Sequence, residues 1–234
     1  MNIENQVIFI TGANRGLGKQ LALEFINKGA KVYAGARNIK SIDYQGAIPV
    51  EIDITNIESI KNAVTNSQDT TILVNNAGSY THTSFLNDDI ETIKKDFETN
   101  FYGTLNVTRE FVPVIRKNKK GAILNILSAL SWFTMKGFAS YSASKSAEWS
   151  LTNSLRIELQ KDNIDVFALH VGFMNTEMVA DLHIPKEEIA DVAKIVVNSL
   201  ENDQYEILAD STSKNVQAGL AGGVKVLYAD MINK

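Results

Sequence analysis

The sequence predicts an α/β protein with three layers, in which helices cover both faces of a doubly wound, mostly parallel, seven-stranded sheet. Short continuous apolar runs alternate with amphipathic segments along nearly the whole chain, and several runs stop at glycine or a small polar residue. Runs of this kind are typical of strands that are buried on both faces. Parallel strands need crossover helices between them, so the alternation itself indicates the architecture.

The predicted strands and helices follow one another in order. Strands are expected at residues 7–10, 31–37, 47–54, 71–74, 122–127, 164–171 and 206–209. Apolar residues at helical spacing predict helices at residues 19–28, 57–66, 89–117, 141–160 and 187–200. No internal repeat or low-complexity linker interrupts the series, which predicts a single domain over residues 1–234.

Composition narrows the function. The 234 residues are 44% hydrophobic, enough for one well-buried core, and the net charge is −4. Basic residues are scattered apart from a short run at 116–120, which argues against a nucleic-acid surface. There is no cysteine to form a disulfide or a thiolate metal site. Every apolar run is shorter than the ~18 residues of a membrane span, and the polar first residues do not resemble a signal peptide. We expect a soluble cytoplasmic protein.

A glycine-rich turn follows the first predicted strand and precedes the first predicted helix. It reads Gly12-Ala13-Asn14-Arg15-Gly16-Leu17-Gly18. Strand, glycine turn and helix in this order build a phosphate-binding unit, because larger side chains would keep the backbone away from the phosphates. Plain turn glycines are the alternative interpretation. The position after the first strand favours a dinucleotide site, and hence a Rossmann fold.

The end of the second predicted strand bears on which dinucleotide binds. An acidic residue about 20 positions after the glycines is typical of NAD sites, but this strand ends in Ala36 and Arg37. A guanidinium suits a 2′-phosphate, and Arg15 could add a second positive charge. The pair indicates NADP(H), with two solvated surface arginines as the alternative. Asp53, at the end of the third strand, is a candidate acceptor for the adenine amino group.

Tyr141 and Lys145 are separated by one helical turn at the start of a predicted helix. A phenol has a pKa of ~10, and a neighbouring ammonium favours its ionised form. Tyr141 is therefore a candidate general acid or base, although an ordinary helix with a surface lysine has the same spacing. Asn100 falls in the middle of another predicted helix, where asparagine is an indifferent helix former. It has either a functional or a structural role.

Taken together, these motifs resemble the short-chain dehydrogenase/reductase family over nearly the whole chain. Thr11–Gly18 resembles its Thr-Gly-x-x-x-Gly-x-Gly turn, and Asn75-Asn76-Ala77-Gly78 its Asn-Asn-Ala-Gly strand end. Tyr141 and Lys145 are similar to its active-site pair, and Ser128 lies 13 residues before Tyr141, as the family's catalytic serine does. Asn100 matches the mid-helix position of the catalytic asparagine.

The resemblance implies hydride exchange between NADP(H) and a small to medium carbonyl or alcohol. Tyr141 would then exchange the proton, Lys145 would lower its pKa and bind the nicotinamide ribose, Ser128 would bind the substrate oxygen, and Asn100 would support a water path. It also implies a homodimer or homotetramer. The implied cofactor contacts are Gly12, Asn14, Arg15, Gly16, Leu17, Gly18, Arg37, Asp53, Ile54, Asn75, Ala77, Gly78, Tyr141, Lys145, Gly172, Met174 and Thr176.

Two departures from the family pattern concern the wall opposite the catalytic pair. Val171-Gly172 replaces the usual Pro-Gly, so the turn is less fixed in φ, whereas Thr176 stands where the family's threonine contacts the carboxamide. Only about ten residues, 177–186, separate this turn from the next predicted helix. We therefore expect a short substrate loop at about residues 173–186 and an open pocket.

Several other residues carry alternative interpretations. The three histidines, His82, His170 and His183, lack metal-site spacing, so no metal is expected. Ser131 and Ser140 are alternatives to Ser128, but neither is expected at a strand end. A non-catalytic dinucleotide-binding sensor on the same fold is the competing function. Residues that could either line the pocket or pack in the core or an interface are Trp132, Phe133, Met135, Trp149, Met174 and Met178.

Overall fold

The computed structural model describes residues 1–118, 121–177, 180–181 and 183–229. Its seven strands form one sheet in the order β3-β2-β1-β4-β5-β6-β7, and every pairing is parallel. The predicted doubly wound sheet is confirmed, and it is parallel throughout. The strands are β1 Val7–Thr11, β2 Lys31–Ala36, β3 Ala47–Glu51, β4 Ile72–Asn75, β5 Gly121–Ile126, β6 Ile164–His170 and β7 Glu206–Leu208.

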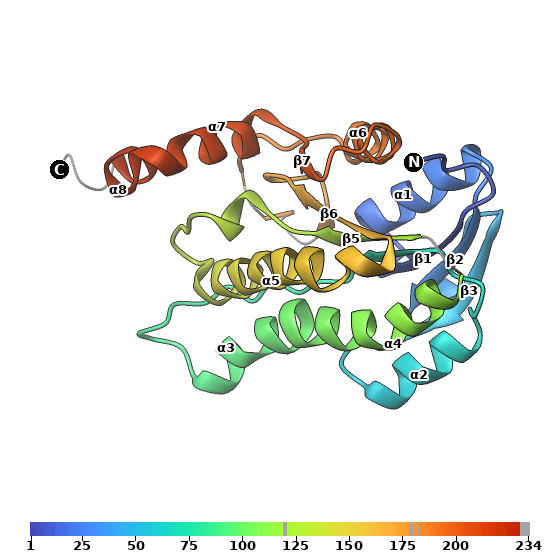
Figure 1. Cartoon of the computed structure of the whole chain (residues 1–234). Helices are drawn as coiled ribbons and strands as arrows, with labels where there is room; N and C mark the ends of the chain where they lie inside the picture. Colours follow the sequence, from blue (N-terminus) through green and yellow to red (C-terminus); the bar gives the residue numbers. More distant parts are fainter. Residues whose placement is uncertain (119–120, 178–179, 182, 230–234) are drawn as a thin grey trace.

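Helices cover both faces of this sheet (Figure 1). One face carries α1 and α6, and the other carries α2, α4 and α5. The long helices are α1 Gly16–Asn27, α2 Ile57–Thr65, α4 Thr104–Lys117, α5 Ala139–Glu158 and α6 Ile189–Glu201. Each begins and ends within a few residues of the predicted bounds, except for the segment that contains α4.

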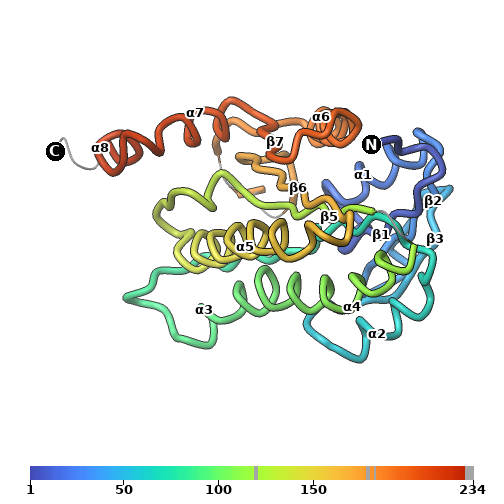
Figure 2. Tube along the Cα trace, in the orientation of Figure 1, coloured from blue at the N-terminus to red at the C-terminus, as the bar shows by residue number. Residues whose placement is uncertain are grey.

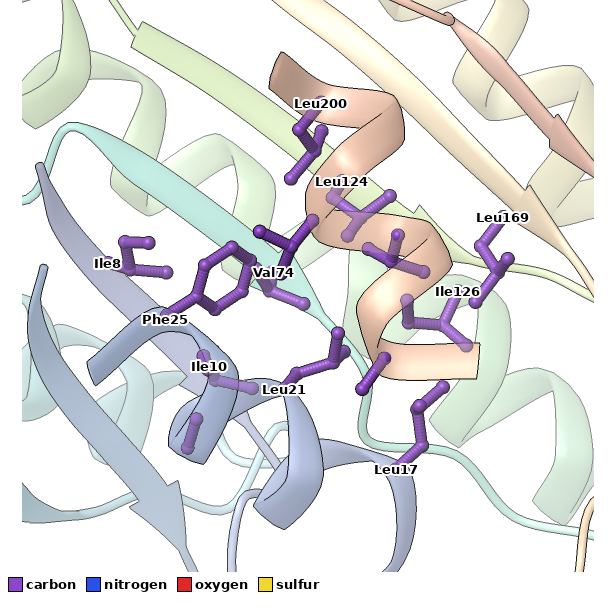
Figure 3. Packing of buried hydrophobic residues seen from close by; sticks show 14 of the residues in the cluster. Ile8, Ile10, Leu17, Leu21, Phe25, Val74, Leu124, Ile126, Leu169 and Leu200 are labelled. Atoms are coloured by element: carbon purple, nitrogen blue, oxygen red, sulfur yellow. The ribbon is translucent and has the colours of Figure 1, made fainter. Parts of the chain in front are cut away.

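The two cores lie between the sheet and these helix layers. Figure 3 shows the first, where Leu21 and Phe25 of α1 and Leu200 of α6 meet Ile8 and Val74 of the sheet. The second contains Phe9, whose ring centroid lies 4.6 Å from that of Phe111 on α4. Both cores are built from strands with apolar residues on both faces, as the continuous apolar runs predict.

The predicted single helix over residues 89–117 is in fact three helical pieces. Asp89 caps α3 Ile90–Asp96 by accepting a hydrogen bond from the Thr92 N–H at 2.9 Å. A π-helical stretch, Phe97–Gly103, then separates α3 from α4. Such stretches widen a helix locally and are frequent at functional sites. Asn100 lies in this stretch, and its amide hydrogen-bonds outside the helix.

The chain after β7 is helical, which the apolar pattern does not predict. α7 Ser211–Gly219 and α8 Val224–Leu227 follow the sheet and run away from it toward the C-terminus, as the trace in Figure 2 shows. Only Ser213 of α7 is buried, so the helix lacks the periodic apolar face that reveals a helix in a sequence. A capping box between Asp210 and Ser213 begins it. Among the helices described, none has the length and apolar character of a membrane span.

Candidate active site

A cleft of about 540 Å³ opens beyond the carboxyl ends of the strands. We call it the main cleft. The chain winds from β1 outward to β3 and then returns to β4 on the other side of β1, so the strand order reverses there. Doubly wound sheets bind ligands at this switch point. The predicted site residues that line the main cleft are Gly12, Asn14, Arg15, Gly16, Leu17, Arg37, Asp53, Ile54, Ala77, Gly78, Ser128, Tyr141, Lys145, Gly172, Met174 and Thr176.

The glycine turn packs against the end of β4. Gly12 has φ +65°, and a Cβ on it would lie 3.0 Å from the Ala77 Cα, so no other residue fits without strain. Gly18 does not line the main cleft. A Cβ there would collide with the Gly12 carbonyl and the Asn76 amide, so its role is close packing. The side chain of Arg15, the N-cap residue of α1, does not hydrogen-bond the first turn of the helix, and Gly16 and Leu17 of that turn line the main cleft.

Asn75, the last residue of β4, was predicted to contact the cofactor, but the structure places it differently from the following Asn76. Asn75 is 3% exposed and lies inside the fold, where its amide donates to Thr108 Oγ1 at 3.0 Å and to Asn125 Oδ1 at 2.8 Å. Side chains alternate along a strand, so Asn76 turns toward the main cleft instead. Its amide donates to the Thr11 carbonyl at 2.9 Å, which ties the strand end to the glycine turn. The prediction that Asn75 contacts the cofactor is therefore wrong, and the residue has a structural role.

Charged groups gather at the end of the main cleft beyond β2 and β3. Arg37 is exposed after β2, and Ala36 leaves no carboxylate at the strand end. Two hydrogen bonds from Thr55 and the nearby Arg37 guanidinium lower the pKa of Asp53. Arg15 forms an exposed ion pair with Glu177 from the predicted substrate loop. This part of the cleft thus offers two guanidinium groups and two carboxyl groups, those of Asp53 and Glu177.

The catalytic candidates converge on the opposite part of the main cleft. Tyr141 and Lys145 project from the first turns of α5, which begins at Ala139 rather than at the predicted Tyr141. Ser128 follows β5, where its Oγ accepts from the Leu130 N–H at 3.1 Å and begins a short 3-10 turn. Lys145 is 5% exposed, and its ammonium donates to the Ile126 carbonyl at 2.7 Å.

Burial raises the pKa of the Tyr141 phenol above its ordinary value, and this is the largest influence on it. The Lys145 ammonium and the Ser128 hydroxyl act to lower that pKa, whereas the carboxylates of Glu148 and Asp96 act to raise it. Tyr141 consequently carries its proton at neutral pH. A protonated phenol beside a substrate oxygen is a proton donor.

Asn100 lies behind the main cleft and does not line it; the neighbouring Thr99 does. Its Oδ1 accepts from the Ser79 N–H at 2.8 Å, and its Nδ2 donates to the Ser79 carbonyl at 3.0 Å and to Ser144 Oγ at 2.9 Å. These bonds fix the segment after the Asn-Asn-Ala-Gly motif against α5. The contacts of Asn100 are thus with the protein itself.

Two fully buried carboxylates escaped the sequence analysis. Asp96 is 0% exposed and accepts hydrogen bonds from Ser79 Oγ at 3.0 Å, from Thr81 and from Ser140. Glu148 is 1% exposed, and its Oε2 lies 2.7 Å from the Lys145 ammonium. The sequence does place Glu148 seven residues after Tyr141, and this spacing indicates that the two side chains share one face of the helix.

The alternative serines and aromatic residues have structural partners. Ser140 hydrogen-bonds Asp96, and Ser131 Oγ accepts from the Ser128 N–H at 3.3 Å, so neither reaches the main cleft. Trp132 stacks on His170 with ring centroids 3.7 Å apart. The His170 ring in turn lies 3.2 Å from the Ser128 carbonyl. Trp132 therefore supports the strand end that positions Ser128.

A smaller cavity of about 60 Å³ adjoins the main cleft, and Ser128 and Tyr141 line both. We call it the apolar recess. Its lining carries no charged side chain among the described residues, and Met178 of the predicted loop lies outside them. The Tyr80 and Phe138 rings stack at 4.5 Å, and Phe173 meets Phe138 edge-on at 5.6 Å. Phe133 and Met174 also line it, whereas Trp132, Met135 and Trp149 do not.

Comparison with known proteins decides the family. Residues 6–187 match the family model described as short chain dehydrogenase. The chain belongs to this family. It has the family's fold, and its glycine turn and its Tyr141-Lys145 pair line the main cleft.

Solved and curated relatives agree with this assignment. A short chain dehydrogenase from Burkholderia cenocepacia J2315, solved in complex with NADP, is 36% identical, with 99% of each chain covered and a TM-score of 0.94. A 3alpha-hydroxysteroid dehydrogenase from Mediterraneibacter gnavus is 32% identical, over 78% of this chain and 79% of its own. An NADPH-dependent 1-acyldihydroxyacetone phosphate reductase from Schizosaccharomyces pombe is 31% identical over 73% of this chain, which spans 60% of the yeast protein's length.

Proposed function

We propose that the protein is an NADP(H)-dependent oxidoreductase that interconverts a small to medium, uncharged carbonyl compound and its alcohol. The observation that carries the proposal is the position of Tyr141. Its phenol lies where the main cleft meets the apolar recess, beside Ser128 and one turn from the Lys145 ammonium. A proton donor at such a junction can reach a carbonyl oxygen seated in the recess.

The residues of the main cleft fit a nicotinamide dinucleotide, which would supply the hydride. Gly12 and Gly16 let the backbone approach a diphosphate, and the first turn of α1 offers free N–H groups to it. Lys145 uses two of its three N–H donors on Ile126 and Glu148, and it lines the cleft with the third available to a ribose hydroxyl. Arg15 and Arg37 favour a 2′-phosphate, and the relative from B. cenocepacia was solved with NADP.

Each protein group then has one role in the reduction. Ser128 Oγ hydrogen-bonds the carbonyl oxygen and stabilises the negative charge that develops there. Tyr141 donates its phenolic proton to that oxygen, and Lys145 stabilises the phenolate that results. In the reverse direction Tyr141 accepts the proton of the alcohol, which requires its ionised form.

The lining of the apolar recess supports an uncharged substrate. A carboxylate or phosphate seated against Phe133, Phe138 and Phe173 would lose its hydration without gaining a cation. NADPH oxidation with benzaldehyde and with 4-carboxybenzaldehyde tests this directly. We expect kcat/KM to be at least about tenfold higher for the neutral aldehyde, because an unpaired buried charge costs more than about 1.4 kcal/mol.

A charge placed in the recess sharpens the test. Phe133→Arg should raise the relative activity on 4-carboxybenzaldehyde, because the guanidinium supplies the missing partner. Tyr102→Arg is the matched control, since Tyr102 is 47% exposed and lies outside the recess. Equal activity of the wild type on both aldehydes would contradict the substrate class. Firm NADPH binding with no oxidation by any carbonyl would contradict the enzymatic function itself.

The cofactor preference rests on the end of β2. Arg37→Asp places a carboxylate where a 2′-hydroxyl would be bound and removes the partner of a 2′-phosphate. We expect the ratio of kcat/KM for NADPH over NADH to fall at least about tenfold, since a charge-assisted pair contributes ~1.5–3 kcal/mol. Lys40→Asp, a charge change of the same sign nearby but outside the cleft lining, should leave the ratio unchanged. An unaltered ratio in Arg37→Asp would remove Arg37 from the site.

A further inference from the structure

Glu148 is a buried carboxylate that the proposed mechanism does not use. It lies on α5 seven residues after Tyr141 and three after Lys145, so all three side chains share one face of the helix. Its side chain is 1% exposed and that of Lys145 is 6% exposed, and the two charged atoms are 2.7 Å apart. An ion pair this deeply buried is costly to form, since both charges leave water. Its presence at the proton-transfer group therefore calls for a role there.

Burial raises the pKa of Glu148 above its ordinary value, whereas the Lys145 ammonium and the hydrogen bonds to both carboxylate oxygens favour the ionised form. Oε2 accepts from Lys145, and Oε1 accepts from the Thr104 hydroxyl at 3.2 Å, at the start of α4. Burial alone would lower the pKa of Lys145, but the charge of Glu148, with Tyr141 and Asp96, raises it overall. The ammonium is thus kept charged and anchored between Glu148 and the Ile126 carbonyl.

We propose that Glu148 is a positioning residue of the proton-transfer group: its carboxylate anchors the Lys145 ammonium and offsets its charge, so that Tyr141 keeps the proton that carbonyl reduction needs. The proposal rests on Tyr141 acting as the proton donor. With Glu148 in place, Tyr141 faces a nearly neutral pair rather than a free cation. The attraction that would otherwise drive the phenol to ionise is weakened.

Other charged and titratable groups also surround Tyr141, and their effects on its ionisation must be distinguished from the effect of Glu148. Asp96 faces it from the end of α3, and its charge acts in the same direction as that of Glu148. The Tyr80 ring approaches from the segment after β4, with centroids 5.8 Å apart, and His170 of β6 contacts the Ser128 carbonyl. Substitution of Glu148 leaves these three groups unchanged, so a change in the titration of Tyr141 reports on Glu148.

The test is the spectrophotometric titration of Tyr141 in the full-length protein. The chain has seven tyrosines, and subtracting the curve of Tyr141→Phe isolates the one of interest. The same subtraction is made in Glu148→Gln and Glu148→Met backgrounds, which both remove the charge and differ in polarity. We expect Tyr141 to ionise at a pH lower by about one unit or more than in the wild type, because a nearby charge typically shifts a pKa by ~1–3 units. Glu148→Asp retains the charge and should shift it far less.

Kinetics provide the second measurement. In the two uncharged variants, the alkaline loss of NADPH-dependent carbonyl reduction should move to lower pH by the same amount as the titration, which a merely structural defect would not produce. Glu148→Asp should keep the wild-type pH profile even if its kcat falls. Ionisation of Tyr141 at the wild-type pH, or above it, in Glu148→Gln or Glu148→Met would overturn the proposal. The titration needs no turnover, so an inactive wild type would count against the proposed function and leave this result to stand by itself.

Discussion

At the scale of single residues, the active site is a set of charges removed from water. Lys145, Glu148 and Asp96 are all buried, and each has hydrogen-bond partners in the protein. Buried charged groups whose hydrogen bonds are all satisfied resist rearrangement, because breaking one pair leaves a buried charge without a partner, which costs free energy. The consequence is a Tyr141 phenol whose surroundings are rigid, which suits a group that must meet a substrate oxygen at hydrogen-bond distance.

Removal of the phenolic hydroxyl tests the central role. Tyr141→Phe keeps the ring and its edge-on contact with Tyr80, but it has no proton to donate. We expect kcat for carbonyl reduction to fall by about 10²–10⁴-fold, the usual contribution of general acid catalysis. NADPH affinity, measured by fluorescence titration, should stay within about threefold of the wild type. Near-normal turnover would exclude Tyr141 as the proton donor.

The raised pKa of Tyr141 predicts opposite pH dependences for the two directions. Reduction needs the protonated phenol, so its kcat should be flat through neutral pH and decline only above about pH 10, the ordinary value for a phenol. Alcohol oxidation needs the phenolate, so its rate should rise with pH over the same range. Steady-state rates in overlapping buffers measure both. A reduction rate that falls by half between about pH 7 and pH 8 would contradict the raised pKa.

At the scale of elements, the helical segment from α3 to α4 is the least regular part of the site and the most connected. Its π-helical stretch places Asn100 against the backbone of Ser79, and Asp96, which ends α3, accepts bonds from Ser79, Thr81 and Ser140. The segment after β4 and the start of α5 are thereby fixed to one another. Aromatic walls of the apolar recess, Tyr80 and Phe138, come from these same two segments.

Asp96→Asn tests this connection. Asn has one acceptor oxygen in place of two, so at least one of the buried donors loses its partner. We expect the free energy of unfolding, from urea denaturation, to fall by about 1–3 kcal/mol. Glu91→Gln is the matched control on the same helix, because Glu91 is 72% exposed and should change stability far less. If the two variants unfold at the same urea concentration, Asp96 does not stabilise the segment.

At the scale of the whole molecule, the outer surface of α5 is available for association. Ile157 on this helix is 77% exposed, and Tyr102 on the neighbouring π-helical stretch is 47% exposed. Both side chains are apolar and lie exposed on neighbouring helical segments, as is typical of an association surface. We propose that this surface forms the contact between two copies of the chain.

Light scattering after size exclusion measures the assembly. The wild type should have the mass of a dimer or tetramer, and Ile157→Glu should lower it toward that of a monomer, because two carboxylates would be buried in a symmetric contact. Val224→Glu, at the exposed start of α8, is the matched control and should leave the mass unchanged. A wild type that is monomeric at micromolar concentration would contradict the assignment.

The sequence by itself determined the sheet, the order of its elements and most of the site. Short continuous apolar runs that end at glycine or a small polar residue are typical of strands buried on both faces, and such residues are local signals. Gly12 could be placed by its turn and Tyr141 and Lys145 by their helical spacing, whereas Ser128 was placed by the resemblance to the family. The π-helical break at Asn100 could not, because one short π-helical stretch barely disturbs the apolar pattern of a long helical segment.

Only the tertiary structure decided which of two neighbouring asparagines faces the main cleft and which charged side chains form buried pairs. Asn75 and Asn76 are chemically identical, and the alternation of side chains along β4 turns one inward and one into the main cleft. Glu148 reads as an ordinary helical residue until the packing of α5 against β5 and α4 buries it beside Lys145. Burial and pairing are properties of the packed molecule, since they depend on segments far apart in the chain, and they set the chemistry of Tyr141.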